Sequence, residues 1–100
     1  MKLKLDNFHG NILSLMRSCG YAFLDRSPDD EWNFVRRMGA GDYPRFHCYV
    51  KKEEGNLAIN LHLDQKRPSY QGSRGHSGEY EGEIITLEAE RLRQSLPKTR

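Results

Sequence analysis

The fold is decided by one stretch, residues 44–64, which reads PRFHCYVKKEEGNLAINLHLD. Apolar and polar residues alternate along both of its halves, a period typical of strands with one buried face. The apolar positions are Phe46, Cys48, Val50, Leu57, Ile59, Leu61 and Leu63. Between the halves, a charged run ends in Gly55 and Asn56, two residues that tolerate the left-handed backbone of a hairpin turn. The stretch therefore predicts a β-hairpin with its loop at residues 53–56.

The alternation also predicts how the two strands pair. With this loop, every apolar residue of one strand meets an apolar residue of the other, and a slip by one residue would expose them all. In this register His47 lies opposite His62 on the polar side, and Arg45 lies opposite Asp64. Directly opposed side chains have Cβ atoms roughly 4.5–5.5 Å apart. We therefore expect two imidazoles and a carboxylate to share one patch.

Length and composition limit the class of protein. One hundred residues are enough for one domain with a modest core, and we predict a single α+β domain over residues 1–100. Apolar residues make up 36% of the chain and charged residues 30%, so few side chains are available for that core. The net charge of +2 is too small to indicate nucleic-acid binding by itself. Cys19 and Cys48 are too few for a disulfide framework, and we expect both as buried thiols.

The remaining composition signals concern location. The basic start of the chain, residues 1–5, is not followed by the apolar segment of a signal peptide. No apolar run reaches the length that a membrane span requires. We therefore expect a cytoplasmic protein with no membrane partner.

Upstream of the hairpin, the pattern predicts a helix and two strands. Helical spacing of apolar residues runs from Phe8 to Cys19, with the N-cap at Asn7 or Asn11 and a left-handed C-terminal cap at Gly20. Alternation in the aromatic segment that follows indicates a short strand. The sequence Ser-Pro-Asp-Asp at residues 27–30 fits either a type I turn or a helix start. We predict a strand over residues 31–38, with a short helix as the alternative.

Downstream of the hairpin, residues 65–82 are predicted as a long loop, which in a small domain is usually functional or mobile. A helical stripe follows, with Glu88–Arg91 and Glu90–Arg93 pairs expected on the solvent side. A strand over residues 79–85 is the alternative, because β-branched residues cluster there. Residues 97–100 should fray after the proline. The apolar stripe consists of Ile85, Ala89, Leu92 and Leu96.

This order of elements predicts a two-layer α+β sandwich. An N-terminal helix, a three- to four-stranded antiparallel sheet and a C-terminal helix would follow one another, with both helices on one face. The other face of the sheet would be polar. It would carry His47, Tyr49, Asn60, His62 and Asp64.

Two resemblances add to this description. The segments PRFH at residues 44–47, LHLDQK at 61–66 and HSGEYEG at 76–82 resemble a group of short, uncharacterised bacterial proteins, and this resemblance brings no known activity. The opening, from Ile12 to Phe23, is similar to the first helix and strand of double-stranded-RNA-binding-like folds, including small messenger-RNA-cleaving toxins. That similarity implies an RNA ligand. The toxins carry a Gly-Ser-His element in an early strand, whereas this chain reads DEWNF at residues 30–34.

The polar side of the hairpin supports a hypothesis of metal binding. His47, His62 and Asp64 would supply two imidazoles and a carboxylate, a ligand set used at open iron and zinc centres. His76 or Glu79, delivered by the long loop, would complete a site for a divalent metal. The ordinary alternative is a solvated polar face on which Asp64 pairs with an arginine.

Two further hypotheses need no metal. His47, His62 and His76 are candidate catalytic groups for acid–base hydrolysis of a phosphate-bearing substrate, because imidazole exchanges protons near neutral pH. The alternative is a non-catalytic RNA-binding module, in which cations bind phosphates and aromatic rings stack on bases. A phosphate-bearing small molecule would use the same groups. These binding residues are Arg45, Tyr49, Lys66, Arg67, Tyr70 and Arg74.

Overall fold

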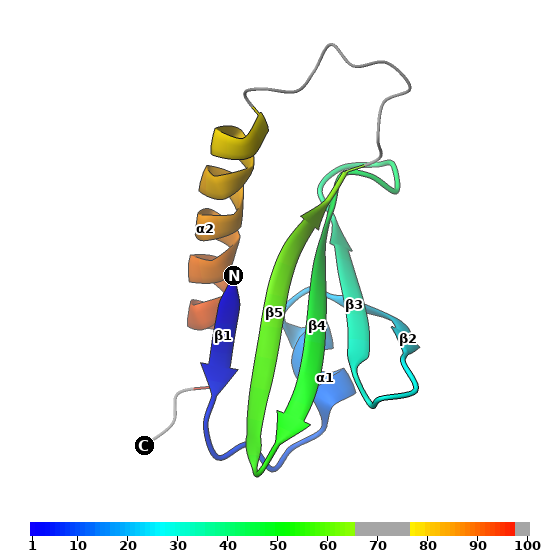
Figure 1. Cartoon of the computed structure of the whole chain (residues 1–100), viewed down its shortest axis with the longest axis vertical. Coiled ribbons are helices and arrows are strands. Elements are labelled where there is room, and N and C mark those ends of the chain that lie inside the picture. The colour runs from blue at the N-terminus through cyan, green and yellow to red at the C-terminus, as the bar shows by residue number, and fades with distance from the viewer. Residues whose placement is uncertain (66–76, 98–100) are drawn as a thin grey trace.

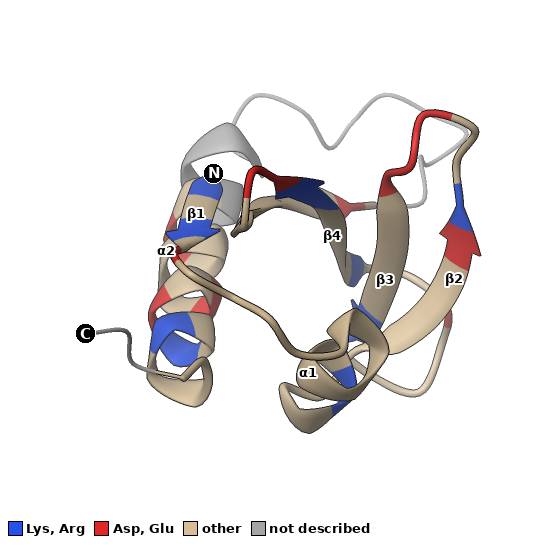
Figure 2. Ribbon diagram, turned by 90° about the horizontal axis from the view of Figure 1, so that it is seen from below, with Lys and Arg blue, Asp and Glu red and all other residues tan. Residues whose placement is uncertain are grey.

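The structure, a computed structural model, describes residues 1–65 and 77–97, with side chains described for residues 1–65 and 82–97. In chain order its elements are β1 (Lys2–Leu5), α1 (Ile12–Ser18), β2 (Ala22–Arg26), β3 (Trp32–Arg37), β4 (Arg45–Glu53), β5 (Asn56–Asp64) and α2 (Ser77–Ser95). The strands form one antiparallel sheet in the order β1-β5-β4-β3-β2 (Figure 1). Figure 2 shows the sheet curving around the two helices, which share one core with it. The predicted α+β class is confirmed.

The sheet has five strands rather than the predicted three to four, because the start of the chain adds an edge strand. β1 pairs with β5, so that Leu3 lies opposite Ile59. Leu3 and Leu5 are each 5% exposed, whereas Lys2 and Lys4 point to solvent. Two leucines in a four-residue segment are too few for periodicity to reveal a strand.

The central hairpin has the predicted register. Every pair that the alternation predicts is present, including His47 opposite His62. The chain turns at Glu54 and Gly55, whose φ angles are 53° and 86°. Two central residues with positive φ form the type I′ turn, which matches the twist of the flanking strands. The left-handed pair lies one residue earlier than predicted, and Asn56 is instead the first residue of β5.

The first helix begins and ends where the sequence indicates. The Asn11 side chain accepts a hydrogen bond from the Ser14 amide at 2.9 Å, so Asn11 rather than Asn7 is the N-cap of α1. Gly20, just beyond the helix, has a φ of 93°. This left-handed conformation strongly favours glycine, and it confirms the predicted C-terminal cap.

A second hairpin, β2–β3, follows α1. The Asp30 amide donates to the Ser27 carbonyl at 3.0 Å, which makes residues 27–30 a turn rather than a helix start. Asp30 itself has a φ of 69°, as expected where a type I turn is followed by one left-handed residue. The predicted strand over residues 31–38 is confirmed as β3, and the alternative helix is wrong.

The second helix, α2, begins earlier than predicted. Residues 77–82, predicted as the end of the loop, are helical; residues 66–76 of that loop lie outside the described residues, as do residues 98–100 of the predicted frayed tail. The alternative strand is wrong, because Ile84 and Ile85 pack against the core and such contacts outweigh a small propensity cost. Neither helix of the described part is long and apolar enough to cross a membrane. The buried stripe contains Ala89, Leu92 and Leu96.

One charged residue of α2 lies inside the molecule. Glu88, predicted on the solvent side, has a side chain that is only 4% exposed. The Tyr21 hydroxyl donates to its Oε2 at 2.6 Å, and Arg91 donates to both carboxylate oxygens at 2.9 and 2.8 Å. Arg36 of β3 donates to Oε1 at 3.3 Å. The predicted pairing with Arg91 is present, but it forms part of a buried network that joins α2 to the sheet.

These donors decide the charge of Glu88. Burial raises the pKa of this carboxyl, but the hydrogen bonds from Arg91 and Tyr21 and the charge of Arg36 outweigh burial and hold the pKa below its usual range. Glu88 is therefore an ionised, fully hydrogen-bonded carboxylate in the core. It stabilises the packing of α2 against the sheet as long as it keeps its charge.

The two cysteines are free and buried, as predicted. Burial raises the pKa of Cys48 to about 12. Burial likewise raises the pKa of Cys19 above its ordinary value. Both thiols are therefore protonated packing groups rather than nucleophiles at neutral pH.

Replacing Glu88 with glutamine should lower the free energy of unfolding by about 2–4 kcal/mol, because Arg36 and Arg91 lose their charged acceptor. Since folding lowers this pKa, the stabilisation is present above the unfolded value of about 4.3 and is lost as pH falls through the folded value. Urea denaturation at neutral and acid pH measures the difference, which should shrink in acid. Glu90→Gln, in an exposed pair with Arg93, is the control and should change stability by about 0.5 kcal/mol or less. Equal losses in both variants would contradict the assignment.

Candidate functional site

The face of the sheet turned away from the helices, which we call the open face, is built by the strand register. One row crosses all five strands, from Lys2 through Asn60, Tyr49 and Asn33 to Asp25. The neighbouring row brings His62, His47 and Val35 side by side, and the next contains Asp64, Arg45 and Arg37. The predicted sharing of one face by His47, His62 and Asp64 is therefore confirmed.

A chain of hydrogen bonds crosses four of the strands. His47 Nδ1 lies 2.8 Å from Asp64 Oδ2, and His47 Nε2 lies 3.2 Å from Asn33 Oδ1. The Asn33 amide in turn donates to Asp25 Oδ1 at 2.6 Å. Because that donation turns the Asn33 carbonyl towards His47, both ring nitrogens face oxygen acceptors. His47 therefore joins Asn33 to Asp64 within one Asp25–Asn33–His47–Asp64 chain.

The position of His47 within this chain restricts its chemistry. The residue is 8% exposed, and each of its nitrogens is already hydrogen-bonded to protein. Arg45 adds a further donor to Asp64, with Nε 3.4 Å from Oδ2. His47 in this arrangement presents no free nitrogen to a metal ion or a substrate. It serves instead to hold neighbouring side chains in place.

An aromatic pair stands beside the chain. The Tyr49 ring stacks on the His47 ring, with centroids 4.2 Å apart and planes at 9°. The exposed His62 ring meets Tyr49 edge-on, with centroids 5.2 Å apart and planes at 89°. Burial and then the charge of Asp64 raise the pKa of Tyr49, so its hydroxyl remains a donor at neutral pH. The Tyr49 ring therefore contacts both histidine rings.

Lysines border this aromatic pair. Lys2 and Lys4 lie on β1, and Lys51 lies two residues after Tyr49 on β4. Neighbouring strands are about 4.8 Å apart, which places the Lys2 backbone roughly 10 Å from that of Tyr49 across β5. Among the described residues, Lys2 and Lys51 form no ion pair, and Lys4 forms only an exposed one with Asp6 at 4.0 Å. In the described part of the chain, no carboxylate therefore lies within ion-pair distance of Lys2 or Lys51, and the field of Asp29 reaches Lys51 only from farther away.

The side chains of the remaining predicted site residues lie outside the described part of the chain. His76, Lys66, Arg67, Tyr70 and Arg74 lie outside the described residues, and Glu79 lies in α2 with its side chain outside the described part. Within residues 1–65 and 82–97, no three His, Cys, Asp or Glu side chains come together as metal ligands do. The described part of the predicted site consists of Arg45, His47, Tyr49, His62 and Asp64.

Two members of the site were missing from the sequence prediction. Asn33 and Asp25 complete the hydrogen-bonded chain, and Asn33 is only 8% exposed. The sequence feature that could have revealed Asn33 is its position between Trp32 and Phe34, because alternation places it on the face opposite those two rings. Its pairing with Tyr49 follows only from the β3–β4 register.

Comparisons with protein-family models, with curated proteins and with solved structures found no match to this chain. The geometry of the open face is accordingly the basis for a functional proposal.

The two histidines should differ sharply in their effect on stability. His47→Ala should lower the free energy of unfolding by about 2–3 kcal/mol, because it removes the hydrogen-bond partner of the buried Asn33 carbonyl oxygen and one of the two partners of Asp64. His62→Ala should change it by about 0.5 kcal/mol or less, since that side chain is exposed. Thermal and urea denaturation measure both values. Similar losses in the two variants would show that the hydrogen-bonded chain does not stabilise the sheet.

Proposed function

We propose that the open face binds single-stranded RNA without cleaving it. The observation that carries this proposal is the pair of Tyr49 and His62 on the open face, bordered by Lys2 and Lys51, which form no ion pair with any described residue. Unstacked bases bind to aromatic side chains on such surfaces, while cations follow the phosphates. His47 is occupied by its bonds to the protein, and this favours binding over hydrolysis.

Each group on the face has a part in this binding. The exposed His62 ring offers a surface on which a base can stack, and the edge-on contact with Tyr49 holds that ring in place. The Tyr49 hydroxyl can donate a hydrogen bond to the RNA. Asn60, between Lys2 and Tyr49 in the same row, offers an amide that can bond to the edge of a base. Lys2 lies in the same row as Tyr49 and Lys51 lies in the next row, where each can bind a neighbouring phosphate.

The ligand is expected to be single-stranded because of the aromatic rings. Double-stranded RNA keeps its bases stacked and is recognised by shape and by contacts to its backbone, so it would leave His62 without a partner. The proposal keeps the RNA ligand that the N-terminal resemblance implies. It assigns that ligand to the sheet rather than to the helices.

Removing the exposed ring tests the stacking. His62→Ala should weaken binding of a labelled mixed-sequence single-stranded RNA by about 5- to 150-fold, the value of one base–aromatic stack. Fluorescence polarisation at low salt measures the affinity. His9→Ala removes another exposed histidine, in the segment between β1 and α1, and should leave affinity unchanged. No binding by the unaltered protein, or equal effects of the two variants, would refute the proposal.

The lysines can be tested through salt. Each phosphate contact to single strands contributes about −0.7 to the slope of log affinity against log salt. The double variant Lys2→Met, Lys51→Met should therefore flatten the slope by about 1.4. The control replaces Lys52, whose side chain belongs to the helix side of the sheet, and should retain the original slope. Equal slopes for the double variant and the unaltered protein would exclude these lysines from the interface.

A further inference from the structure

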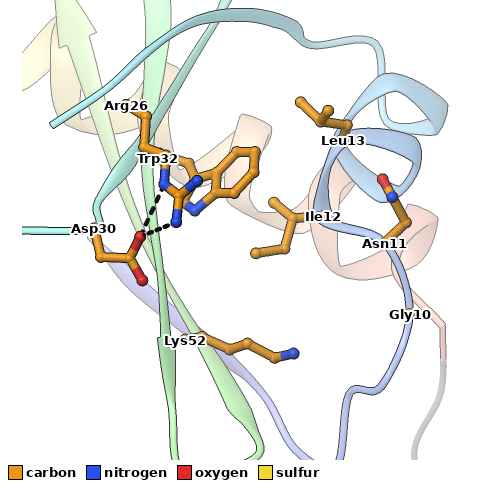
Figure 3. Close-up of a pocket in the computed structure, with 8 residues that line it drawn as sticks. All are labelled: Gly10, Asn11, Ile12, Leu13, Arg26, Asp30, Trp32 and Lys52. Carbon is orange, nitrogen blue, oxygen red and sulfur yellow. Dashed lines mark hydrogen bonds and ion pairs between the residues drawn. The ribbon is translucent and has the colours of Figure 1, made fainter.

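A second site lies on the opposite side of the sheet from the open face. A cavity of about 280 Å³ opens between the start of α1 and the ends of β2, β3 and β4 (Figure 3). At about 30 Å³ per water molecule, this space would hold roughly nine waters, which is the size of a small organic ligand. Its lining combines apolar and charged side chains. Its lining residues include Ile12, Arg26, Asp30, Trp32 and Lys52.

The apolar part of the lining includes Trp32 and Ile12. Figure 3 shows the Trp32 indole and the Ile12 side chain extending towards each other from β3 and α1. The Arg26 guanidinium lies 4.6 Å from the Trp32 ring centroid, and Phe23 packs against the same indole with centroids 5.8 Å apart. These contacts fix the orientation of the indole. A planar ring is the shape that fits between a fixed indole and an aliphatic side chain.

The charged part of the lining favours a single negative charge. Arg26 donates through Nε and Nη2 to Asp30, so these two charges compensate each other. Lys52 extends into the space from β4 (Figure 3), and no carboxylate of the described residues pairs with it. The lining thus keeps one uncompensated positive charge. A carboxylate matches it, whereas a phosphate carries about −1.5 to −2 at neutral pH.

We propose that this cavity binds a small aromatic carboxylate. The ring lies between Trp32 and Ile12, and the carboxylate accepts charge-assisted hydrogen bonds from the Lys52 ammonium. The guanidinium of Arg26, held in place by Asp30, lies beside the same anion. A ligand of this size has a dissociation constant of roughly millimolar order. The site is independent of RNA binding, because neighbouring residues of β4 point to opposite faces of the sheet.

The sequence supplies its own reporter for this test. Trp32 is the single tryptophan of the chain, so intrinsic fluorescence reports directly on the cavity. Titration of the full chain with benzoate should give a saturable change. Benzamide, which has the same shape without the charge, should bind at least about 10-fold more weakly, because it loses a charge-assisted hydrogen bond. Inorganic phosphate should not compete with benzoate.

Variants at two adjacent lysines assign the charge. Lys52→Met keeps the length of the side chain, removes its charge and should weaken benzoate binding by about 10-fold or more. Lys51→Met changes the open face and should leave benzoate binding unaltered. Amide chemical shifts of Gly10 and Ile12 give a second readout that does not depend on fluorescence quenching. A non-saturable titration, equal binding of benzamide, competition by phosphate or equal effects of the two variants would overturn the proposal.

Discussion

The pairing of β4 with β5 in a single register is the constraint on which the rest of the molecule depends. It directs one set of side chains into the core and the alternating set to the open face, so both surfaces are decided at once. β3 and β1 then extend the same alternation outward on either side. A different register would bury imidazoles and lysines and expose the leucines. The chemistry of the open face is therefore a consequence of how the core is packed.

Much of this arrangement was predictable, because a period of two is a local signal. The alternation from Phe46 to Val50 and from Leu57 to Leu63 was enough to predict the β4–β5 register. The pairing of His47 with His62 followed from that register. The fifth strand was not predictable, since β1 exists only through pairing with β5, far away in the sequence. The sequence analysis wrongly predicted Glu88 on the solvent side for a related reason. A glutamate three residues before an arginine has the same pattern on an exposed or a buried helix face, and its other partners are distant in sequence.

The candidate site, like the fold, was predictable where it depends on residues close in sequence, and it was not predictable where it depends on contacts between distant segments. Alternation placed His47, Tyr49, His62 and Asp64 together, but it could not show that the Tyr49 ring connects the two histidines. Asn33 enters through a different hairpin, and its contact with His47 depends on packing between strands. Lys51 and Lys52 illustrate how much a single residue step matters, because they serve opposite faces. Among the described residues, no buried side-chain nitrogen or oxygen is left without a hydrogen-bond partner.

The hydrogen-bonded chain across β2 to β5 has a further consequence for association with any ligand of the open face. Its members are already fixed by one another, and His47 holds the Tyr49 ring in a stacked position before a ligand arrives. Such preorganisation reduces the conformational entropy that binding would otherwise remove. Encounters should then proceed by rigid-body docking guided by the bordering lysines, at rates that diffusion and charge determine. A hydrogen-bond network within the sheet would thereby also speed the proposed binding.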